Sequence, residues 1–282
     1  MRPALIAVLA AAGLVIGPAL RSLIVRMSVP AGQPWRRSCP CCEGPLPPAR
    51  TTSAAATSRA PARGPAPAAP RAPVTASMSA SRPRTALPVL PPAGRCPACC
   101  ARLGPPALTV EITAAVVLGT LAARIHPPLV LAAVCWLAVC AIPLAYIDAA
   151  VRRLPDLLTA AAWAGTAVFL LAAAADSGAW SRLGRGVAGG AAYAAFCLVL
   201  FLISPSGMGP GDVKLAASLG TALAWLGWGA LAEGALAGFL LGAGYGVTLL
   251  MHGRAGRKTQ LPFGPFMIAG TFLVLAAAGL PG

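Results

Sequence analysis

Two isolated carboxylates beside long apolar segments are the groups in this 282-residue chain best suited to chemistry. Asp212 ends the sequence GMGPGD at 207–212, and Asp148 ends the sequence YID at 146–148. The chain has seven acidic residues, and a carboxylate at the boundary of a membrane segment is costly and usually functional. The glycines before Asp212 leave room for a second backbone or a substrate to come close.

If the helices that carry them are neighbours, Asp148 and Asp212 can converge on one water molecule. One carboxylate then activates the water, and the other, protonated, donates to the carbonyl oxygen of a peptide bond. This predicts aspartyl peptidase chemistry. A simpler interpretation is that Asp212 caps the helix after it and Asp148 pairs with Arg152 one turn away. Asp156 follows Pro155, and we expect it to cap a helix and to take no part in catalysis.

The composition is typical of a polytopic membrane protein. Mean hydropathy is +0.76, with 57% hydrophobic and 10% charged residues. Apolar segments approach the ~20 residues needed to span a bilayer. They are expected at 4–24, 107–123, 129–147, 157–175, 186–203, 213–227, 231–251 and 262–278. The predicted fold class is therefore all-α, with about eight transmembrane helices that alanine and glycine allow to pack closely.

The formal charge of +15 indicates a membrane surface as the partner. The basic residues are scattered without interleaved aromatic residues, so we expect attraction to anionic membrane lipid and no nucleic-acid binding. Lysine and arginine concentrate at 36–102, 152–153, 214 and 254–258. This bias predicts that these segments are cytosolic, that both termini lie on the opposite side, and that both aspartates lie at the cytosolic boundary.

Two cysteine clusters, CPCC at 39–42 and CPACC at 96–100, predict a metal site. Two CxxC pairs supply four thiolates for a tetrahedral zinc ion in a reducing compartment. The expected ligands are the four cysteines of these pairs, Cys39, Cys42, Cys96 and Cys99. Cys41 and Cys100 are adjacent alternatives, and loose thiols in a flexible loop are the simpler interpretation.

The segment between the clusters divides the chain into three parts. Residues 47–92 are rich in Ala, Pro, Arg, Ser and Thr. Such a composition buries too little apolar surface to offset the ordering entropy, so we expect disorder there. We therefore predict a first transmembrane helix at 1–26, a cytosolic loop at 27–106 that carries both clusters, and a seven-helix membrane peptidase core at 107–282.

The chain resembles the bacterial type IV prepilin peptidases, which are GxGD-type intramembrane aspartyl proteases. The matching stretches occur in the family's order and are GLVIGPALRSLIVRM, CPCC, GRCPACC, YIDAAVRRLPD, GMGPGDVKLAASLG and LPFGPFMIAG. The resemblance implies a bacterial cell-membrane enzyme with Asp148 and Asp212 as its catalytic pair. Its implied activity removes the short basic leader of a prepilin or pseudopilin, just after a glycine, at the cytosolic face. In LPFGP at 261–265, proline suits a first helical turn and glycine permits close approach, although a plain helix start explains the stretch adequately.

Many members of this family also methylate the new N-terminal amine with S-adenosylmethionine. Glu111 matches an acidic position in the longer members, and the resemblance implies a role for it in methyl transfer. The low-complexity sequence between the cysteine clusters departs from the family in this region.

Two other functions account for fewer of these residues. A transporter also uses membrane carboxylates, but its sites typically lie at the bilayer midplane between inverted repeats, and no clear repeat is present. A non-catalytic zinc-knuckle membrane scaffold leaves the two aspartates without a role.

Overall fold

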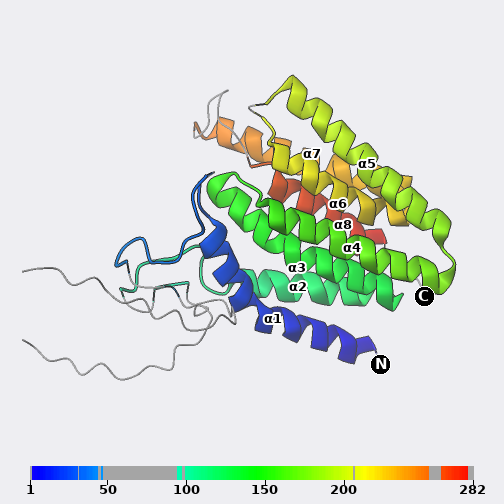
Figure 1. Cartoon of the computed structure of the whole chain (residues 1–282), viewed down its shortest axis with the longest axis horizontal. Helices are drawn as coiled ribbons and strands as arrows, with labels where there is room; N and C mark the ends of the chain where they lie inside the picture. The colour runs from blue at the N-terminus through cyan, green and yellow to red at the C-terminus, as the bar shows by residue number, and fades with distance from the viewer. Residues whose placement is uncertain are drawn as a thin grey trace, which may run out of the picture.

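The computed structural model describes residues 2–30, 32–43, 46, 94–96, 99–205, 207–253 and 262–278. The segment at 47–92, expected to be disordered, lies outside the described residues. The described part is a bundle of eight helices (Figure 1). In chain order they are α1 (Arg2–Met27), α2 (Thr109–Arg124), α3 (Pro128–Val151), α4 (Asp156–Ser177), α5 (Trp180–Ile203), α6 (Pro210–Leu226), α7 (Trp228–Met251) and α8 (Gly264–Ala278). These residues form no strand, only isolated bridges such as that between Arg95 and Arg102.

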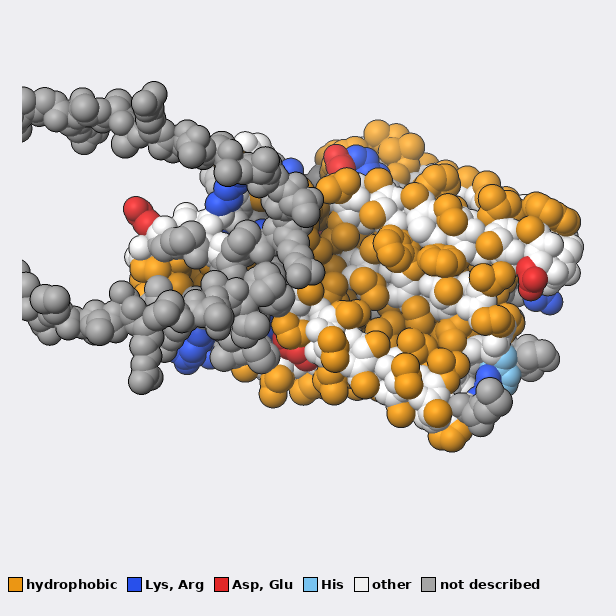
Figure 2. All heavy atoms as spheres, turned by 60° about the horizontal axis from the view of Figure 1, so that its bottom comes forward, with side chains coloured by type: hydrophobic (Ala, Val, Ile, Leu, Met, Phe, Trp, Pro, Cys, Tyr) orange, Lys and Arg blue, Asp and Glu red, His pale blue; other side chains and the backbone are white. Residues whose placement is uncertain are grey.

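Five of these helices, α1, α3, α4, α5 and α7, are long and apolar enough to cross a membrane. The other three are shorter, with 16 residues in α2, 17 in α6 and 15 in the apolar α8. Figure 2 shows hydrophobic side chains over the visible face of the bundle and charged side chains toward its two ends. The all-α membrane fold is confirmed, and each of the eight expected segments corresponds to one helix.

The centre of the bundle is formed by α3 and α6. In α3, 67% of the most apolar window is buried, against 17–33% in the other four candidate spans. In α6, residues 215–225 are buried almost without interruption. A helix that is buried on all sides belongs to the core. The bundle therefore holds these two helices, which carry the predicted catalytic pair, between the other six.

The fifth helix begins at Trp180, although we expected its start at residue 186. Arg182 and Arg185, expected between two spans, belong to its first turns. The side chain of Arg185 donates from Nε to the carbonyl oxygen of Ala224 at 2.8 Å and from Nη2 to that of Trp225 at 2.9 Å. These carbonyls end α6, where a cation is favoured by the helix dipole. Hydropathy alone misses these turns because the neighbouring helix satisfies the arginine.

A buried ion pair joins α1 to α2. Arg21 donates from Nε to Oε1 of Glu111 at 3.0 Å and from Nη2 to Oε2 at 2.6 Å, and the two residues are 0% and 2% exposed. The guanidinium also donates to the carbonyl oxygens of Pro105 and Pro106, at 2.8 and 3.0 Å. Arg21 therefore connects α1, α2 and the segment that leads from the cysteine clusters into α2.

We expect Arg21→Met to destabilise the protein strongly, because removing one partner of a buried ion pair leaves an uncompensated charge at a cost of about 3–5 kcal/mol. The double variant Arg21→Met/Glu111→Gln removes both charges and should recover part of this loss. Lys214→Met, which breaks an exposed pair with Asp156, is the matched control and should cost less than about 1 kcal/mol. Thermal unfolding in detergent measures all three, and a double variant no more stable than Arg21→Met would contradict the assignment.

Candidate active site and metal centre

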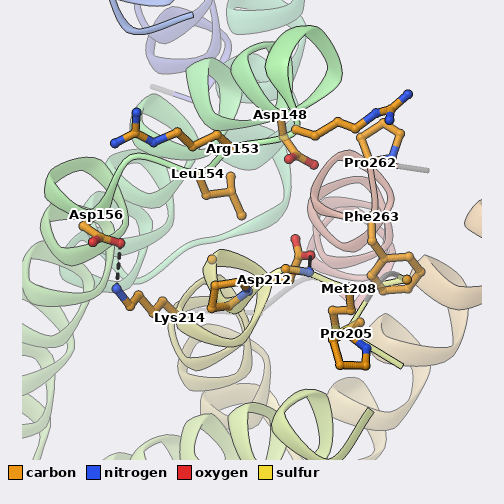
Figure 3. A pocket seen from close by; sticks show the side chains of 15 residues that line it. Asp148, Arg153, Leu154, Asp156, Pro205, Met208, Asp212, Lys214, Pro262 and Phe263 are labelled. Carbon is orange, nitrogen blue, oxygen red and sulfur yellow. Dashed lines mark hydrogen bonds and ion pairs between the residues drawn. The ribbon is translucent and has the colours of Figure 1, made fainter. Parts of the chain in front are cut away.

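Asp148 and Asp212 face each other across one cavity, as the sequence predicted (Figure 3). Asp148 lies near the C-terminal end of α3, and Asp212 lies in the first turn of α6. Their exposed fractions are 5% and 6%. The ion pair between Asp148 and Arg152, which was the simpler interpretation, is not found among the described residues. The structure instead places the two carboxylates together.

The GMGPGD sequence fixes the direction of the Asp212 side chain. Gly209 precedes α6, and Pro210 takes the first helical position, where its missing N–H costs little. The backbone N–H of Gly209 donates to Oδ2 of Asp212 at 2.9 Å, which is one half of a capping box. Gly211 is required because a Cβ there would lie 2.8 Å from the Cβ of Leu154. Capping therefore occupies one oxygen of Asp212 and leaves the other available.

Gly264, the first residue of α8, lies beside both carboxylates. Its backbone N–H donates to Oδ2 of Asp148 at 3.1 Å. A Cβ added to Gly264 would lie 2.8 Å from that oxygen and 3.5 Å from Oδ1 of Asp212. Oδ1 of Asp212 is buried and has no hydrogen-bond partner among the described residues. Gly264 therefore lies beside two carboxylate oxygens, Oδ2 of Asp148, which its amide holds, and Oδ1 of Asp212, which has no protein partner among the described residues.

Sequence reasoning noted that the glycine of LPFGP permits close approach, but it did not identify Asp148 as the group that approaches Gly264. The partner could not be found from the sequence, because Asp148 lies 116 residues away in the chain.

The cavity between the aspartates has a volume of about 350 Å³. The end of α3 and the turn after it form one wall, and the loop between α5 and α6, the first turn of α6 and the residues before α8 form the rest. Basic side chains stand at its rim, from Arg152, Arg153 and Lys214, and Met208 and Phe263 add apolar surface. This volume is within the range of ligand sites, about 300–1,000 Å³.

Asp156 differs from its expected role as a helix cap. Pro155 is the residue before α4, no side chain caps this helix, and Asp156 is its first helical residue. Its Oδ1 accepts a hydrogen bond from Nζ of Lys214 at 2.7 Å, and both side chains are largely exposed. Asp156 therefore lies at the rim of the cavity (Figure 3), in a first helical turn where a negative charge is favoured.

The four cysteines of the CxxC pairs form one group whose sulfur atoms all lie within 4.8 Å of one another. The distance between Sγ of Cys39 and Sγ of Cys99 is 3.7 Å, and that between Sγ of Cys42 and Sγ of Cys96 is 3.8 Å. A tetrahedral zinc ion with Zn–S bonds of ~2.3 Å has sulfur–sulfur edges of about 3.8 Å. The predicted four are thus a possible metal-binding group, consistent with zinc. The neighbouring Cys41 and Cys100 are exposed.

The two cysteine clusters fold as two copies of one short unit. In the first unit the N–H of Leu46 donates to the carbonyl oxygen of Arg37 at 2.9 Å. In the second, the N–H of Leu103 donates to that of Gly94 at 2.7 Å, at the same spacing from its CxxC pair. Both leucines are buried, and with Val25 of α1 and the first cysteine of each pair, Cys39 and Cys96, they form a small core. This core attaches the cysteine group to the end of α1.

Glu111 lies away from the aspartate cavity, in the ion pair with Arg21. A second cavity, of about 450 Å³, lies between the end of α1, residues 104–106 and the end of α3. It is lined by Pro105 and Pro106, whose carbonyl oxygens accept hydrogen bonds from Arg21. Both carboxylate oxygens of Glu111 accept hydrogen bonds from Arg21, so in this structure the side chain has a structural role. Its part in methyl transfer stays a prediction.

These features define a helical membrane protein with a buried aspartate pair and a four-cysteine group. Residues 131–247 match the Type IV leader peptidase family, and this stretch contains both aspartates. The resemblance seen in the sequence motifs is therefore confirmed for this part of the chain.

Curated relatives extend the similarity over more of the chain. Three proteins named prepilin leader peptidase/N-methyltransferase are similar to it. That of Burkholderia pseudomallei (strain K96243) is 33% identical over 183 residues, which cover 63% of this chain and 56% of the relative. That of Aeromonas salmonicida (strain A449) is 33% identical over 189 residues, and that of Pseudomonas aeruginosa is 32% identical over 186; each match covers 64% of this chain and 62% of the relative. The chain thus spans about three fifths of these relatives, and no solved structure matches it.

Proposed function

We propose that this protein is a prepilin peptidase, an aspartic endopeptidase of the bacterial inner membrane. It removes the short basic leader of a prepilin or pseudopilin at the cytosolic face. The observation that carries the proposal is the pair of buried carboxylates on one cavity, within the segment that matches the Type IV leader peptidase family. The relatives' names supply the substrate class, and the distribution of lysine and arginine supplies the orientation.

The two aspartates can divide the work of hydrolysis. Backbone amides of Gly264 and Gly209 each hold one carboxylate oxygen, Oδ2 of Asp148 and Oδ2 of Asp212, which leaves Oδ1 of each aspartate for contact with a shared water. The ionised carboxylate takes a proton from the water as its oxygen attacks the scissile carbonyl carbon, and the protonated carboxylate donates to the carbonyl oxygen. Collapse of the tetrahedral intermediate breaks the C–N bond as a proton passes to the nitrogen. The leader leaves with a carboxyl group, and the shortened protein gains an amine.

The alternative functions agree less well with this geometry. A transporter site typically lies at the bilayer midplane, in helices that are interrupted there. Asp148 and Asp212 instead lie at the ends of continuous helices, around a cavity at one end of the bundle. A scaffold has no need for two buried carboxylates that face each other, since each is costly to bury.

We also propose that the four-cysteine group holds a structural zinc ion. Backbone hydrogen bonds from Cys42 and Cys41 lower the pKa of the Cys39 thiol, whereas the pKa of the Cys99 thiol in the same metal-free group is raised. Thiolates are the form that binds metal, so the metal ion itself would have to favour the others. Bound zinc would supply folding free energy to a loop whose two halves are distant in sequence. It takes no part in the proposed hydrolysis.

Methyl transfer to the new amine appears in the relatives' names and stays a prediction for this chain. The described residues around Glu111 do not offer a free carboxylate for it, because Arg21 occupies both oxygens. The proposal for this chain is therefore limited to proteolysis.

Substitution of either aspartate tests the proposed function. Asp148→Asn and Asp212→Asn keep the shape of each side chain but remove the ionisable group, so each should abolish leader removal from a co-expressed prepilin. The double variant should be no worse than either single one, because the two groups act as a unit. Asp156→Asn is the control and should keep most activity. Gel mobility and mass spectrometry of the pilin report cleavage, and substantial cleavage by Asp212→Asn would refute the mechanism.

The role of Gly264 predicts a strong effect from one methyl group. In Gly264→Ala the Cβ would lie 2.8 Å from Oδ2 of Asp148, so the carboxylate must move while the helices stay in place. A displacement of this kind costs roughly 100-fold in kcat. Gly244→Ala is the matched control, because a Cβ at Gly244 in α7 meets no atom within 4 Å. Wild-type kcat in a normally folded Gly264→Ala protein would show that the amide does not position Asp148.

The zinc proposal predicts about one zinc ion per chain in freshly purified, reduced protein. Cys39→Ser should lose most of this metal, and its loop should become more sensitive to added protease. Cys41→Ser should keep the metal, because Cys41 lies outside the group of four neighbouring sulfur atoms. Metal analysis by mass spectrometry decides the matter. A wild-type protein without zinc would exclude the proposal.

A further inference from the structure

The second cavity has no part in the proposed hydrolysis, and it is formed by the ends of two candidate membrane spans. α1 ends at Met27 and α3 at Val151, and both ends lie on one side of the bundle (Figure 1). The last turns of these helices and residues 104–106 line a volume of about 450 Å³. The cavity therefore lies at a boundary of the membrane, on the side where the bias of lysine and arginine predicts the cytosol.

Arg36 is the only charged residue among the described residues that line this cavity. Its backbone N–H donates to the carbonyl oxygen of Arg26, in the last turn of α1, at 3.0 Å, which holds Arg36 level with the end of the helix. Its guanidinium donates from Nη2 to the carbonyl oxygen of Ser28 at 3.4 Å, which is a long hydrogen bond. No carboxylate forms an ion pair with this guanidinium in the described part of the chain. An anion in the cavity would supply the missing partner.

The rest of the lining is chiefly apolar. Ala149 and Ala150 of α3 are exposed and line the cavity, as do Pro105 and Pro106. Trp35, which precedes Arg36, is 52% exposed. Tryptophan is enriched where membrane meets water, so an exposed indole at this level is expected to contact lipid. A cation, an apolar lining and an exposed indole therefore lie together at the membrane boundary.

We propose that the second cavity binds one anionic phospholipid. The phosphate accepts hydrogen bonds from the guanidinium of Arg36, and the glycerol and the first carbons of the acyl chains lie against the apolar lining. Basic pockets between membrane helices on the cytoplasmic side suit anionic head groups. Neither alternative ligand matches the whole lining. A zwitterionic lipid brings a second positive charge close to Arg36, and a soluble anion leaves the apolar walls uncovered.

The last turn of α3 lies between the two cavities of this side of the bundle. Ala149 and Ala150 line the second cavity, whereas Asp148 and Arg152 line the aspartate cavity. A bound lipid therefore fills space behind the turn that carries Asp148. The site itself is defined by the contacts of Arg36 and the alanines, so it does not depend on the proposed peptidase activity.

Lipid retention by the full-length protein tests the role of Arg36. The protein, in detergent, is incubated with dioleoyl phosphatidylglycerol or with dioleoyl phosphatidylcholine, and native mass spectrometry counts the lipids that stay bound. We expect wild-type protein to retain phosphatidylglycerol in preference, and Arg36→Gln to retain roughly fivefold less, the effect of one cationic side chain. Arg37→Gln removes the same charge from an exposed neighbour outside the cavity and should match wild type. Equal retention of the two lipids, or equal losses in the two variants, would overturn the proposal.

Filling the cavity provides a second test that leaves Arg36 in place. Ala150→Phe puts a ring into the space assigned to the lipid and should lower the retention of phosphatidylglycerol at least fivefold. Ala160→Phe is the matched control, because Ala160 is an exposed alanine of α4 that lines neither cavity. Wild-type retention by a normally folded Ala150→Phe protein would overturn the proposal. Displacement of the lipid by excess inorganic phosphate would also overturn it, since the site would then bind a free anion.

Discussion

The hydrogen bond from the backbone of Gly264 to Asp148 is the contact on which the arrangement of the site depends. It requires α8 to begin within a hydrogen-bond length of the end of α3, which only a residue without a side chain permits. The same approach places Oδ1 of Asp212 beside Gly264. Three helices therefore meet at one point, and the two carboxylates belong to one site because the backbone of the third lies between them.

Burial of α3 and α6 makes this meeting point rigid. Both helices are surrounded by other helices, so neither can rotate its aspartate out of the cavity without disturbing the core. The cost of burying two carboxylates is offset locally, by one amide for each, and one oxygen of Asp212 is left without a protein partner. An unsatisfied buried oxygen weakens a fold, and such sites are expected where function requires the group.

Some features of the fold and the site could be predicted from the sequence, and others could not. Eight helices, the aspartate pair and the four-cysteine group follow from hydropathy, from the rarity of carboxylates and from CxxC spacing, because each of these signals is local. The partners of Arg21, Arg185 and Gly264 do not follow, since each lies on a distant segment. For this reason the predicted start of α5 lay too late in the chain, after Arg185. For the same reason the sequence suggested a role in methyl transfer for Glu111, although its side chain is hydrogen-bonded to Arg21 in the structure.

The position of the aspartates at helix ends also determines how a substrate can reach them. A peptide bond within a helix has its carbonyl oxygen occupied by a hydrogen bond, so hydrolysis requires a bond at or beyond the end of the helix. The cavity lies where α6 begins and α3 ends, at one end of the bundle. In the proposed reaction, a substrate helix remains in lipid while only the residues at its end enter the cavity. Under the proposed function, the aspartates therefore act on an extended segment beyond the end of a helix and need not unwind the helix itself.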